Sequence, residues 1–390
     1  MMSPPDGTRL RVAVFGFDVA EASQIRRIRA LRALGCDVTS FCQRREGSPD
    51  FTPDWKNVEL GTVRHRDIRG RALGLGVAVR RALAHWRDLV SADLIVARNL
   101  DLALIALTAR RLAAMRARRR PAPLVYECLD IHDLMTDAGR KGRIMRAVER
   151  RVLQRCALLV VSSPGFVSNY FRPVQGYDGP LAVVENKLWL GSDPAKRPAR
   201  PAVPRLRNGP LVLGLVGSIR CQASVDLLMA TADRMGDRLR VRFSGAVHDH
   251  ALRDFRQQVD SRPNVTWTGG YAYPDGLPQA YAGCDLVWAQ DMWQRGHNSD
   301  WLLPNRIYEA SWCGCPSVGL ADTQTGRRIR QDGLGWVIPT PTPEALAGLL
   351  SGLTQDDLHD RASALLDRPE HDFVQSPHDL EPMLGPARAG

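Results

Sequence analysis

The sequence of 390 residues contains no uninterrupted apolar run of about 18 residues, the length that a membrane-spanning helix needs. Its first residues, MMSPPDGTRLRVAVFGFDV, lack the charged start, long apolar stretch and cleavage site of a secretory signal peptide. These two absences predict a cytoplasmic protein. In that compartment the eight cysteines are expected to be reduced, and the pair Cys313 and Cys315 has no second pair at zinc-site spacing.

The glycine-rich signatures of three large enzyme classes are also missing. There is no G-x-x-x-x-G-K-[ST] loop, no G-x-G-x-x-G turn after a strand and no G-x-S-x-G elbow. These absences disfavour P-loop NTPases, ordinary dinucleotide dehydrogenases and α/β-hydrolases. No Asp-x-Asp pair follows a predicted strand, so we expect neither a metal site nor a cofactor.

Lysine is rare, but the distribution of charge is more informative than the choice of basic residue. Only four of the 53 basic residues are lysines, which is typical of a GC-rich genome. Residues 1–190 contain 32 Arg and Lys against 19 Asp and Glu, whereas the remainder contains 21 against 23. The first half is therefore expected to face an anionic partner.

Three basic segments of the first half suggest what that partner is. They are residues 64–89, 109–120 and 140–155, and the last carries an interleaved apolar stripe. The stripe consists of Ile144, Val148 and Val152. Helical faces of this kind fit an anionic membrane surface. Nucleic acid is the disfavoured partner, because no recognition motif is present and aromatic residues for base stacking are few. A merely solvated basic face is the remaining alternative.

Strand-like and helix-like patterns alternate along the chain in two series. The first series has short apolar runs, typical of buried parallel strands, at 9–17, 36–42, 92–99, 122–130 and 156–163, and a helical pattern at 21–35 that ends on Gly35. The second has runs at 211–219, 238–246, 264–270, 284–290 and 315–321, with helices near 223–235 and 248–260. This alternation predicts an α/β fold of two Rossmann-like βα domains with parallel sheets.

A stretch rich in proline, glycine and charge separates the two series. The predicted domains are residues 1–188 and 211–354, joined by a linker over 189–210. Residues 355–390 form a polar tail that the pattern does not place. Two such domains would form a cleft, with ligands at the carboxyl ends of the strands.

The segment LPNRIYEASWCGCPSVG (303–319) places a cation where a helix dipole disfavours one. Asn305, after a proline, marks a helix start and Gly314 a stop, so Arg306 lies in the first turn. A diphosphate bound by Arg306 would explain this placement, and Glu309, one turn later, could accept two hydrogen bonds from a ribose diol. The alternative is a surface ion pair between Arg306 and Glu309, worth only about 0.2–0.5 kcal/mol.

Two further segments of the second domain are candidates for the same site. GLVGSIR (214–220) places Gly217, Ser218 and Arg220 after a strand, where exposed main-chain amides can bind phosphate oxygens. The long polar and aromatic connection at 288–301 places Gln290 and Asp291 where they could contact the base, ribose or sugar, although it could also be an ordinary surface loop.

These segments resemble the nucleotide-sugar motif of GT-B fold glycosyltransferases. PNRIYEASWCGCPSVGLADTQTGRRI is similar to the family helix that opens with a base and carries an acid, and LGLVGSIR, NVTWTGG and AYAGCDLVWAQ are similarly spaced to the family's second domain. Within the family, the sequence resembles bacterial exopolysaccharide transferases of the succinoglycan and xanthan type. The resemblance implies transfer from a nucleotide diphosphate sugar, expected to be a UDP-sugar, to a lipid-linked oligosaccharide at the inner face of the cytoplasmic membrane.

One departure from the family pattern bears on stereochemistry. Retaining members commonly carry two glutamates with seven residues between them. Glu309 would be the second, but Trp301 stands where the first belongs, and Asp300 is one position away. We therefore expect an inverting mechanism, in which a general base takes the proton of the acceptor hydroxyl.

The segment VYECLDIHD (125–133) is the strongest candidate for that base. Asp130 stands where the resemblance implies the catalytic aspartate of the xanthan glucuronosyltransferase, with His132 as its substitute. Glu127, on the same predicted strand, and Asp18, after the glycine turn of the first strand, are further candidates for the base and could instead contact the substrate, Asp18 through acceptor or sugar hydroxyls. The alternative role for Asp130 is to cap the following helix.

Two other functions are compatible with this fold. A nucleotide-sugar 2-epimerase would act on soluble substrates and would leave the basic half unexplained. A module that binds membrane or protein without catalysis would not need Asp130.

Overall fold

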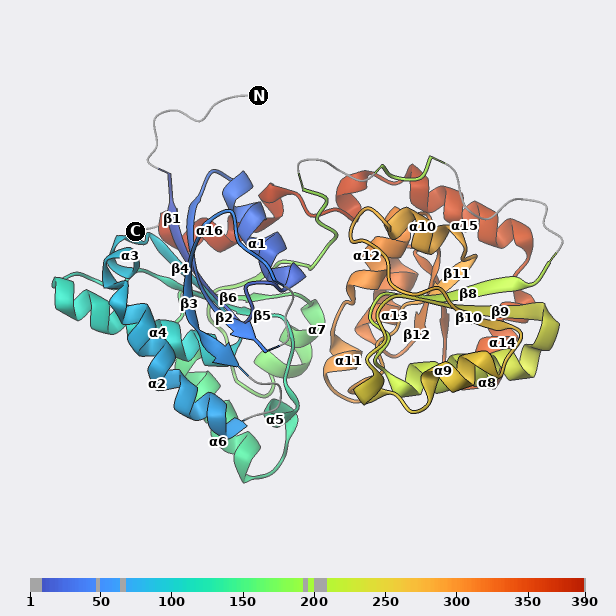
Figure 1. Ribbon diagram of the computed structural model, residues 1–390, viewed down its shortest axis with the longest axis horizontal. Coiled ribbons are helices and arrows are strands. Elements are labelled where there is room, and N and C mark those ends of the chain that lie inside the picture. Colours follow the sequence, from blue (N-terminus) through green and yellow to red (C-terminus); the bar gives the residue numbers. More distant parts are fainter. Residues whose placement is uncertain (1–8, 47–49, 64–67, 192–195, 200–208, 389–390) are drawn as a thin grey trace. The chain divides into compact units, whose positions relative to one another are not determined.

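The computed structural model describes residues 9–46, 50–63, 68–191, 196–199 and 209–388. The chain divides into two units: the first comprises Met1–Val184 and Ser376–Gly390, and the second comprises Glu185–Gln375. Figure 1 labels most of the elements of each.

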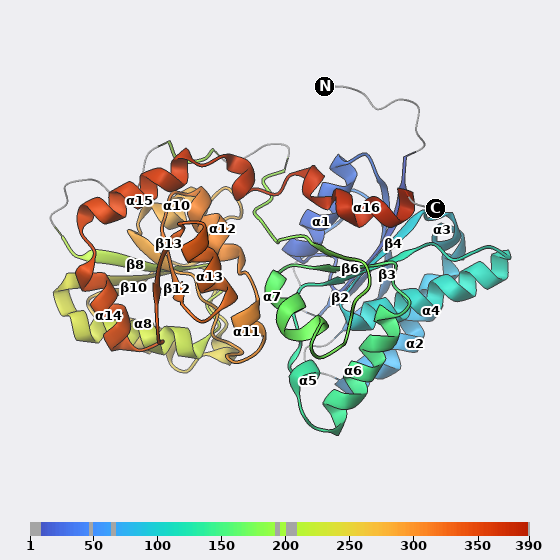
Figure 2. The ribbon, with the colours of Figure 1, turned by 180° about the vertical axis from the view of Figure 1, so that it is seen from behind.

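The first unit is built on a parallel sheet of seven strands in the order β3-β2-β1-β4-β5-β6-β7. The strands are β1 (Arg11–Gly16), β2 (Asp37–Arg45), β3 (Lys56–Val63), β4 (Leu94–Arg98), β5 (Leu124–Cys128), β6 (Leu158–Val161) and β7 (Leu181–Val183). The helices are α1 (Ala22–Ala33), α2 (Ile68–Ala84), α3 (Trp86–Ser91), α4 (Leu100–Ala117), α5 (Asp133–Thr136), α6 (Arg140–Leu153), α7 (Pro164–Phe166), η1 (Val167–Phe171), η5 (Pro377–Leu380) and α16 (Glu381–Arg388). Helices α1 and α16 cover one face of the sheet, and α2, α4 and α6 cover the other (Figures 1 and 2).

The second unit repeats this plan with six parallel strands in the order β10-β9-β8-β11-β12-β13. The strands are β8 (Leu211–Val216), β9 (Leu239–Ser244), β10 (Val265–Trp267), β11 (Leu286–Trp288), β12 (Ser317–Leu320) and β13 (Gly335–Ile338). The helices are α8 (Gln222–Met235), η2 (Gly236–Arg238), η3 (Asp249–Ala251), α9 (Phe255–Asp260), α10 (Leu277–Ala282), α11 (Asn298–Trp301), α12 (Asn305–Trp312), α13 (Gln324–Gln331), α14 (Pro343–Gly352), α15 (Gln355–Asp367) and η4 (Glu370–Asp372).

The sheet of the second unit is buried on both faces, as its apolar strands predict. On β11, Leu286 and Trp288 pack into the core on the α8 side, whereas Val287 and the following Ala289 pack into the core on the α12 side. Side chains of a strand alternate between faces, so a strand covered on both sides is a continuous apolar run. The predicted fold class, two Rossmann-like units with parallel sheets, is confirmed.

In each sheet the strand order reverses once, and this reversal fixes where a ligand can bind. The reversal lies between β1 and β4 in the first unit and between β8 and β11 in the second. Loops leave neighbouring strands in opposite directions at such a point, which opens a crevice at the carboxyl ends of the strands.

The unit boundaries differ from the predicted domains. The first unit ends at Val184 rather than at 188, because Leu188 exchanges main-chain hydrogen bonds with Phe373 and Gln375 of the second unit. The predicted tail, 355–390, is divided: residues up to Gln375 belong to the second unit, and the rest return to the first. Of the predicted linker, residues 192–195 and 200–208 lie outside the described residues.

Some local predictions also need correction. Strands β3, β7 and β13 were not predicted, and the helix expected near 248–260 is shorter, since α9 follows the separate turn η3. On α6 the expected apolar stripe is exposed only in part: Ile144 is 54% exposed, whereas Val152, two turns further on, is buried. All eight cysteines are free thiols. No helix in the described part of the chain has both the length and the apolarity to cross a membrane.

Candidate functional site

Arg306 lies at the strand-order reversal of the second sheet. Its Nε donates to the carbonyl of Val216 at 2.6 Å, and its Nη1 donates to that of Trp288 at 3.3 Å. Val216 ends β8 and Trp288 ends β11, the two strands on either side of the reversal. The guanidinium is therefore fixed by the main chain at the place where doubly wound sheets bind ligands. Its third nitrogen, Nη2, lies 3.8 Å from the position that a Cβ on Gly217 would take.

The turn after β8 depends on glycine. Gly217 has a φ of +107°, which L-residues rarely adopt, and its N–H donates to the Ser244 carbonyl at 2.8 Å. The Gly217 amide is thus already used, contrary to the expectation that it would bind phosphate. Gly245 lies against the same turn, since a Cβ there would be 1.8 Å from the Gly217 oxygen. Because Gly217 has no side chain, the main chain of this turn stays uncovered beside Nη2 of Arg306.

The next residues of this turn carry polar side chains. Ser218 is exposed, and its Oγ lies 2.8 Å from Nε2 of His248. Arg220 is exposed as well, and its Nη2 lies 4.0 Å from Oδ2 of Asp291. Arg220 and Asp291, both predicted for the site, are therefore neighbours. His248 was not predicted, because a single histidine in a polar loop has no signal in the sequence until its partner is known.

Helix α12 begins and ends as predicted and carries Glu309 on its buried side. Pro304 is its N-cap residue, and Gly314, with φ of +69°, follows its end. Glu309 is only 7% exposed, so the alternative of a surface ion pair with Arg306 is wrong. Burial raises the pKa of Tyr271, and the negative charge of nearby Glu309 raises it further.

Asn305, the first residue of α12, is tied to the start of the second unit. Its Oδ1 accepts a hydrogen bond of 2.9 Å from Nδ2 of Asn186. One turn further on, Tyr308 donates to a carboxylate oxygen of Glu185 at 2.8 Å, and Arg328 of α13 forms an ion pair with the same carboxylate. The helix that presents Arg306 is thus held at two points by residues 185–186.

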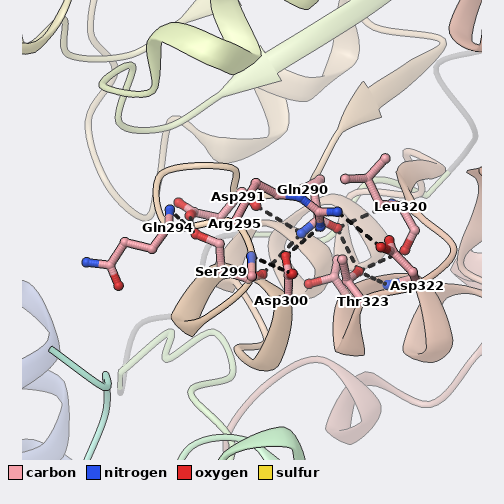
Figure 3. Close-up of polar contacts among 12 residues, drawn as sticks. Gln290, Asp291, Gln294, Arg295, Ser299, Asp300, Leu320, Asp322 and Thr323 are labelled. Carbon is pink, nitrogen blue, oxygen red and sulfur yellow. Dashed lines mark hydrogen bonds and ion pairs between the residues drawn. The ribbon is translucent and has the colours of Figure 1, made fainter. Parts of the chain in front are cut away.

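Gln290 is a buried crosslink of the connection between β11 and α12 (Figure 3). Its Nε2 donates to the carbonyls of Asp291 and Ser299, at 2.9 and 3.2 Å. Its Oε1 accepts from the Leu320 N–H at 3.3 Å and from the Thr323 hydroxyl at 2.9 Å. Because the carboxamide is fully engaged and buried, Gln290 shapes the loop, and the structure does not present it to a ligand as the sequence suggested.

The rest of this loop is held by two carboxylates (Figure 3). Asp291 accepts a hydrogen bond from the Ser299 hydroxyl and another, of 3.0 Å, from the Trp293 N–H. Asp300 pairs with Arg295 at 2.5 Å and accepts the Gly296 N–H at 2.8 Å. Arg295 also reaches Asp322, after β12, at 3.1 Å. These hydrogen bonds and ion pairs fix the conformation of the loop.

In the first unit, Asp130 and His132 lie in the connection after β5. Asp130 is exposed, and its main-chain oxygen accepts from the Cys128 thiol at 3.4 Å. His132, not Asp130, is the N-cap residue of α5: the Leu134 N–H donates to Nδ1 of His132 at 3.2 Å. The capping role considered for Asp130 is thus taken by His132. This hydrogen bond assigns the proton of a neutral imidazole to Nε2.

Glu127, the other predicted carboxylate of β5, is completely buried between two arginines. Its Oε1 lies 2.7 Å from Nη2 of Arg27, and its Oε2 lies 3.0 Å from Nε of Arg98. Burial alone would raise the pKa of Glu127, but the charges of Arg27 and Arg98 outweigh it and lower the pKa. A carboxylate engaged in this way holds β5 to β4 and α1, and it is not placed to contact a substrate.

Asp18 follows β1 and is also buried, with 3% of its surface exposed. Its Oδ1 accepts the Ala20 N–H at 3.1 Å, and its Oδ2 lies 3.9 Å from Nε of Arg45. Asp18 therefore shapes the turn after β1. Of Asp18, Glu127 and Asp130, only Asp130 is exposed. In the part of the chain that the structure describes, no three His, Cys, Asp or Glu side chains gather where they could bind a metal ion.

Two doubly wound units with parallel sheets are the architecture that the resemblance to GT-B glycosyltransferases implies, and the second unit carries a guanidinium at the reversal of its sheet. Residues 26–187 match the family described as glycosyl transferase 4-like domain, and residues 210–356 match the glycosyl transferases group 1. The chain is 33% identical over 361 residues to the succinoglycan biosynthesis protein ExoL of Rhizobium meliloti (strain 1021). The aligned region covers 91% of this chain and 88% of that protein.

Solved structures show the same fold. The sucrose-phosphate synthase tll1590 of Thermosynechococcus elongatus superposes with a TM-score of 0.67 at 15% identity, over 92% of this chain and 95% of that one. Anabaena HepE (Alr3699), solved in complex with UDP and glucose, gives a TM-score of 0.64 at 16% identity, over 98% and 100% of the two chains. The chain belongs to the GT-B glycosyltransferases of the bacterial exopolysaccharide type. It is therefore a glycosyltransferase and not an epimerase or a non-catalytic module.

Proposed function

We propose that this enzyme transfers a sugar from a UDP-sugar to a lipid-linked oligosaccharide in exopolysaccharide biosynthesis. The observation that carries the donor assignment is Arg306, held by two strand-end carbonyls at the reversal of the second sheet. A cation fixed at this point by neutral partners keeps its charge for an anionic ligand. The role in polysaccharide assembly is supported by the similarity to the succinoglycan protein. The choice of UDP as the nucleotide of the donor is supported by the UDP complexes of HepE, which has the same fold.

Arg306 and the main chain of the Gly217 turn would bind the diphosphate, and Arg220 would add a second cation at its edge. We propose that this arrangement stabilises the leaving diphosphate without a metal ion, because fixed positive charges can compensate the charge that develops there. Glu309 and Asn305 would contact the nucleoside, from the buried side of the same helix. Asp291, beside Arg220, would contact the sugar.

For the chemical step we propose inversion with Asp130 as general base. An inverting transfer needs one carboxylate or imidazole that can take the proton of the acceptor hydroxyl as that oxygen attacks the anomeric carbon. Asp130 is exposed at the carboxyl end of β5, whereas Glu127 is engaged by two arginines. His132 is the weaker candidate, because its Nδ1 already accepts a main-chain hydrogen bond and its Nε2 carries the proton.

We further propose that the face formed by α2, α4 and α6 rests on the anionic inner leaflet of the cytoplasmic membrane. These helices lie side by side on the first sheet (Figure 1) and expose apolar side chains among basic ones. The exposed apolar residues are Val77, Leu112, Met115 and Ile144.

The test is co-sedimentation with lipid vesicles: the enzyme should sediment with vesicles that contain anionic lipid and not with neutral vesicles. The double variant Met115→Asp with Ile144→Asp should no longer sediment with the anionic vesicles. Equal binding of the wild type to both kinds of vesicle would contradict the proposal.

The donor assignment is tested by titrating UDP into the wild type, Arg306→Ala and Arg306→Lys in a calorimeter. A charge-assisted hydrogen bond is worth about 1.5–3 kcal/mol, so the alanine variant should bind UDP about 10- to 100-fold more weakly. The UDP affinity of Arg306→Lys should lie between those of the wild type and Arg306→Ala, because lysine keeps the positive charge but not the planar guanidinium fork. Arg234→Ala removes an exposed cation that pairs with Glu344 and serves as control. An unchanged UDP dissociation constant in folded Arg306→Ala would refute the assignment.

A further inference from the structure

Ser218 and His248 form a side-chain pair beside Arg306 that the proposed binding mode does not yet use. Oγ of Ser218 and Nε2 of His248 are 2.8 Å apart. Ser218 follows Gly217, the residue that faces Nη2 of Arg306. The Gly217–Ser218 turn therefore has a guanidinium against one residue and an imidazole against the next.

The main chain holds this pair in place. Beyond the ends of β8 and β9 the two segments continue to pair: the Ile219 N–H donates to the Ala246 carbonyl at 2.9 Å, and the His248 N–H donates to the Ile219 carbonyl at 3.0 Å. His248 thus moves with the Ser218 turn, and its ring is half-buried. Rigid support of this kind is what a ligand-binding side chain needs.

The charges around the pair favour an anion. Arg220 is on the same turn, and Asp249 is 3.9 Å from Arg256 of α9. His250 contacts the His248 ring edge-on, with the ring centres 5.8 Å apart. Asp291 lies beside Arg220. Asp249 and Asp291 thus each lie beside a basic side chain, and the Arg306 guanidinium donates to neutral main-chain carbonyls.

We infer that Ser218 and His248 complete the diphosphate site, and that protonation of His248 strengthens donor binding. A protonated imidazole donates from Nε2 to the Ser218 oxygen, which turns the hydroxyl hydrogen towards a phosphate oxygen and adds a positive charge. A neutral imidazole that accepts the hydroxyl hydrogen presents the serine lone pairs to the phosphate instead. The donor therefore binds more tightly at low pH, and binding takes up protons. This inference rests on the proposed donor site.

The test is calorimetric titration of UDP-glucose, with UDP as a second probe, from about pH 5.5 to about pH 8, where imidazole changes charge. Both phosphates of UDP-glucose are esterified and stay ionised over this range, so its affinity reports the protein alone. The wild type should bind UDP-glucose about five- to tenfold more tightly at the lower pH, the effect of one added charge near a partly exposed anion. At neutral pH the measured heat should depend on the ionisation enthalpy of the buffer, because protons are taken up.

His248→Gln should bind UDP-glucose with an affinity that no longer depends on pH, equal to that of the wild type near pH 8. His250→Gln, which alters the neighbouring ring that does not reach Ser218, should keep the wild-type profile. A flat wild-type profile, or an unchanged profile in His248→Gln, would overturn this inference and leave the donor site standing. A wild-type chain that binds neither UDP-glucose nor UDP at any pH would overturn both.

Discussion

Asp130 and His132, the two side chains after β5 that the sequence predicts as the base, differ in their exposure and hydrogen bonds, which give them different roles. Asp130 is exposed, whereas His132 caps α5 through Nδ1. Loss of a general base typically costs 10²–10⁴-fold in rate, so Asp130→Asn should lower kcat by roughly this factor with little change in UDP affinity. His132→Gln, which can still accept the Leu134 N–H, should lower kcat by less than about tenfold.

The measurement is transfer of labelled sugar from UDP-sugars to lipid extracted from source membranes. A loss in His132→Gln as large as that expected for Asp130→Asn would assign the base to His132. The anomeric configuration of the product tests inversion independently of both variants.

Glu149 of α6 is a buried carboxylate that is held by neutral donors. Tyr126 donates to its Oε1 at 2.8 Å, Gln175 donates to its Oε2 at 2.6 Å, and Tyr170 donates to the same Oε2. Burial raises the pKa of Glu149, although these hydrogen bonds oppose the shift. A raised pKa stabilises the folded state below the ordinary value of about 4.3, and the benefit is lost as pH rises through the folded pKa.

The wild type should therefore lose stability relative to Glu149→Gln as pH rises above about 4.5. Melting temperatures of the two chains, measured by calorimetry at each pH, give this difference directly. Glu59→Gln alters an exposed carboxylate on β3 and should follow the wild type throughout. A constant difference between the wild type and Glu149→Gln would show that Glu149 titrates alike in the folded and unfolded chains.

At the scale of single residues, the sequence predicts a site residue when its unusual placement can be recognised from the residues next to it in the chain. Arg306 could be predicted because a cation in a first turn conflicts with the helix dipole by about 0.3–1 kcal/mol. Glu127 looked like a site residue in the same way as Asp130, because nothing nearby in the sequence shows that Arg27, a hundred residues away, neutralises its carboxylate. His248 is informative only beside Ser218, and that pairing depends on the register of β8 and β9.

The connection between β11 and α12 is the element whose rigidity depends on one side chain. Gln290→Ala removes four hydrogen bonds and leaves the buried Leu320 N–H without its acceptor. Each unsatisfied buried group costs about 1–3 kcal/mol, so we expect destabilisation of about 2–4 kcal/mol and a loosened loop. Limited trypsin digestion should then cleave after Arg295 faster than in the wild type. Gln294→Ala, in the same loop, is the control, and equal cleavage rates in all three chains would contradict this role.

Elements were predictable where burial makes the pattern strong. The central strands of both sheets are covered on both faces and read as continuous apolar runs. Strands β3, β7 and β13 stand at sheet edges, where polar residues or short length weaken the pattern. Helix α16 could be seen only with the three-dimensional structure, because its contacts with β4, β5 and β6 join residues more than 200 positions apart.

At the scale of the whole molecule, the chain passes between the units twice, after Val184 and after Gln375. The first unit is therefore incomplete without the end of the chain. Leu380 and Met383 are fully buried there, and Leu384 is 1% exposed. Arg197 lies in the described part of the predicted linker. It donates to the carbonyls of Trp312, Leu365 and Arg368 and so fixes the end of α15 within the second unit.

This division predicts which part of the molecule each ligand and each mutation affects. Units with separate cores tend to melt separately, and UDP should raise the transition of the second unit, since it binds only when that unit is folded. Leu380→Ala with Met383→Ala should cost about 2–5 kcal/mol per side chain and lower the other transition, the one that UDP does not shift. The matched pair Leu358→Ala with Leu365→Ala, equally buried on α15, should lower the transition that UDP raises. Scanning calorimetry of the three full-length chains with and without UDP separates these effects. If the variants at 380 and 383 lowered the UDP-sensitive transition, the end of the chain would belong to the donor unit and the division at Gln375 would be wrong.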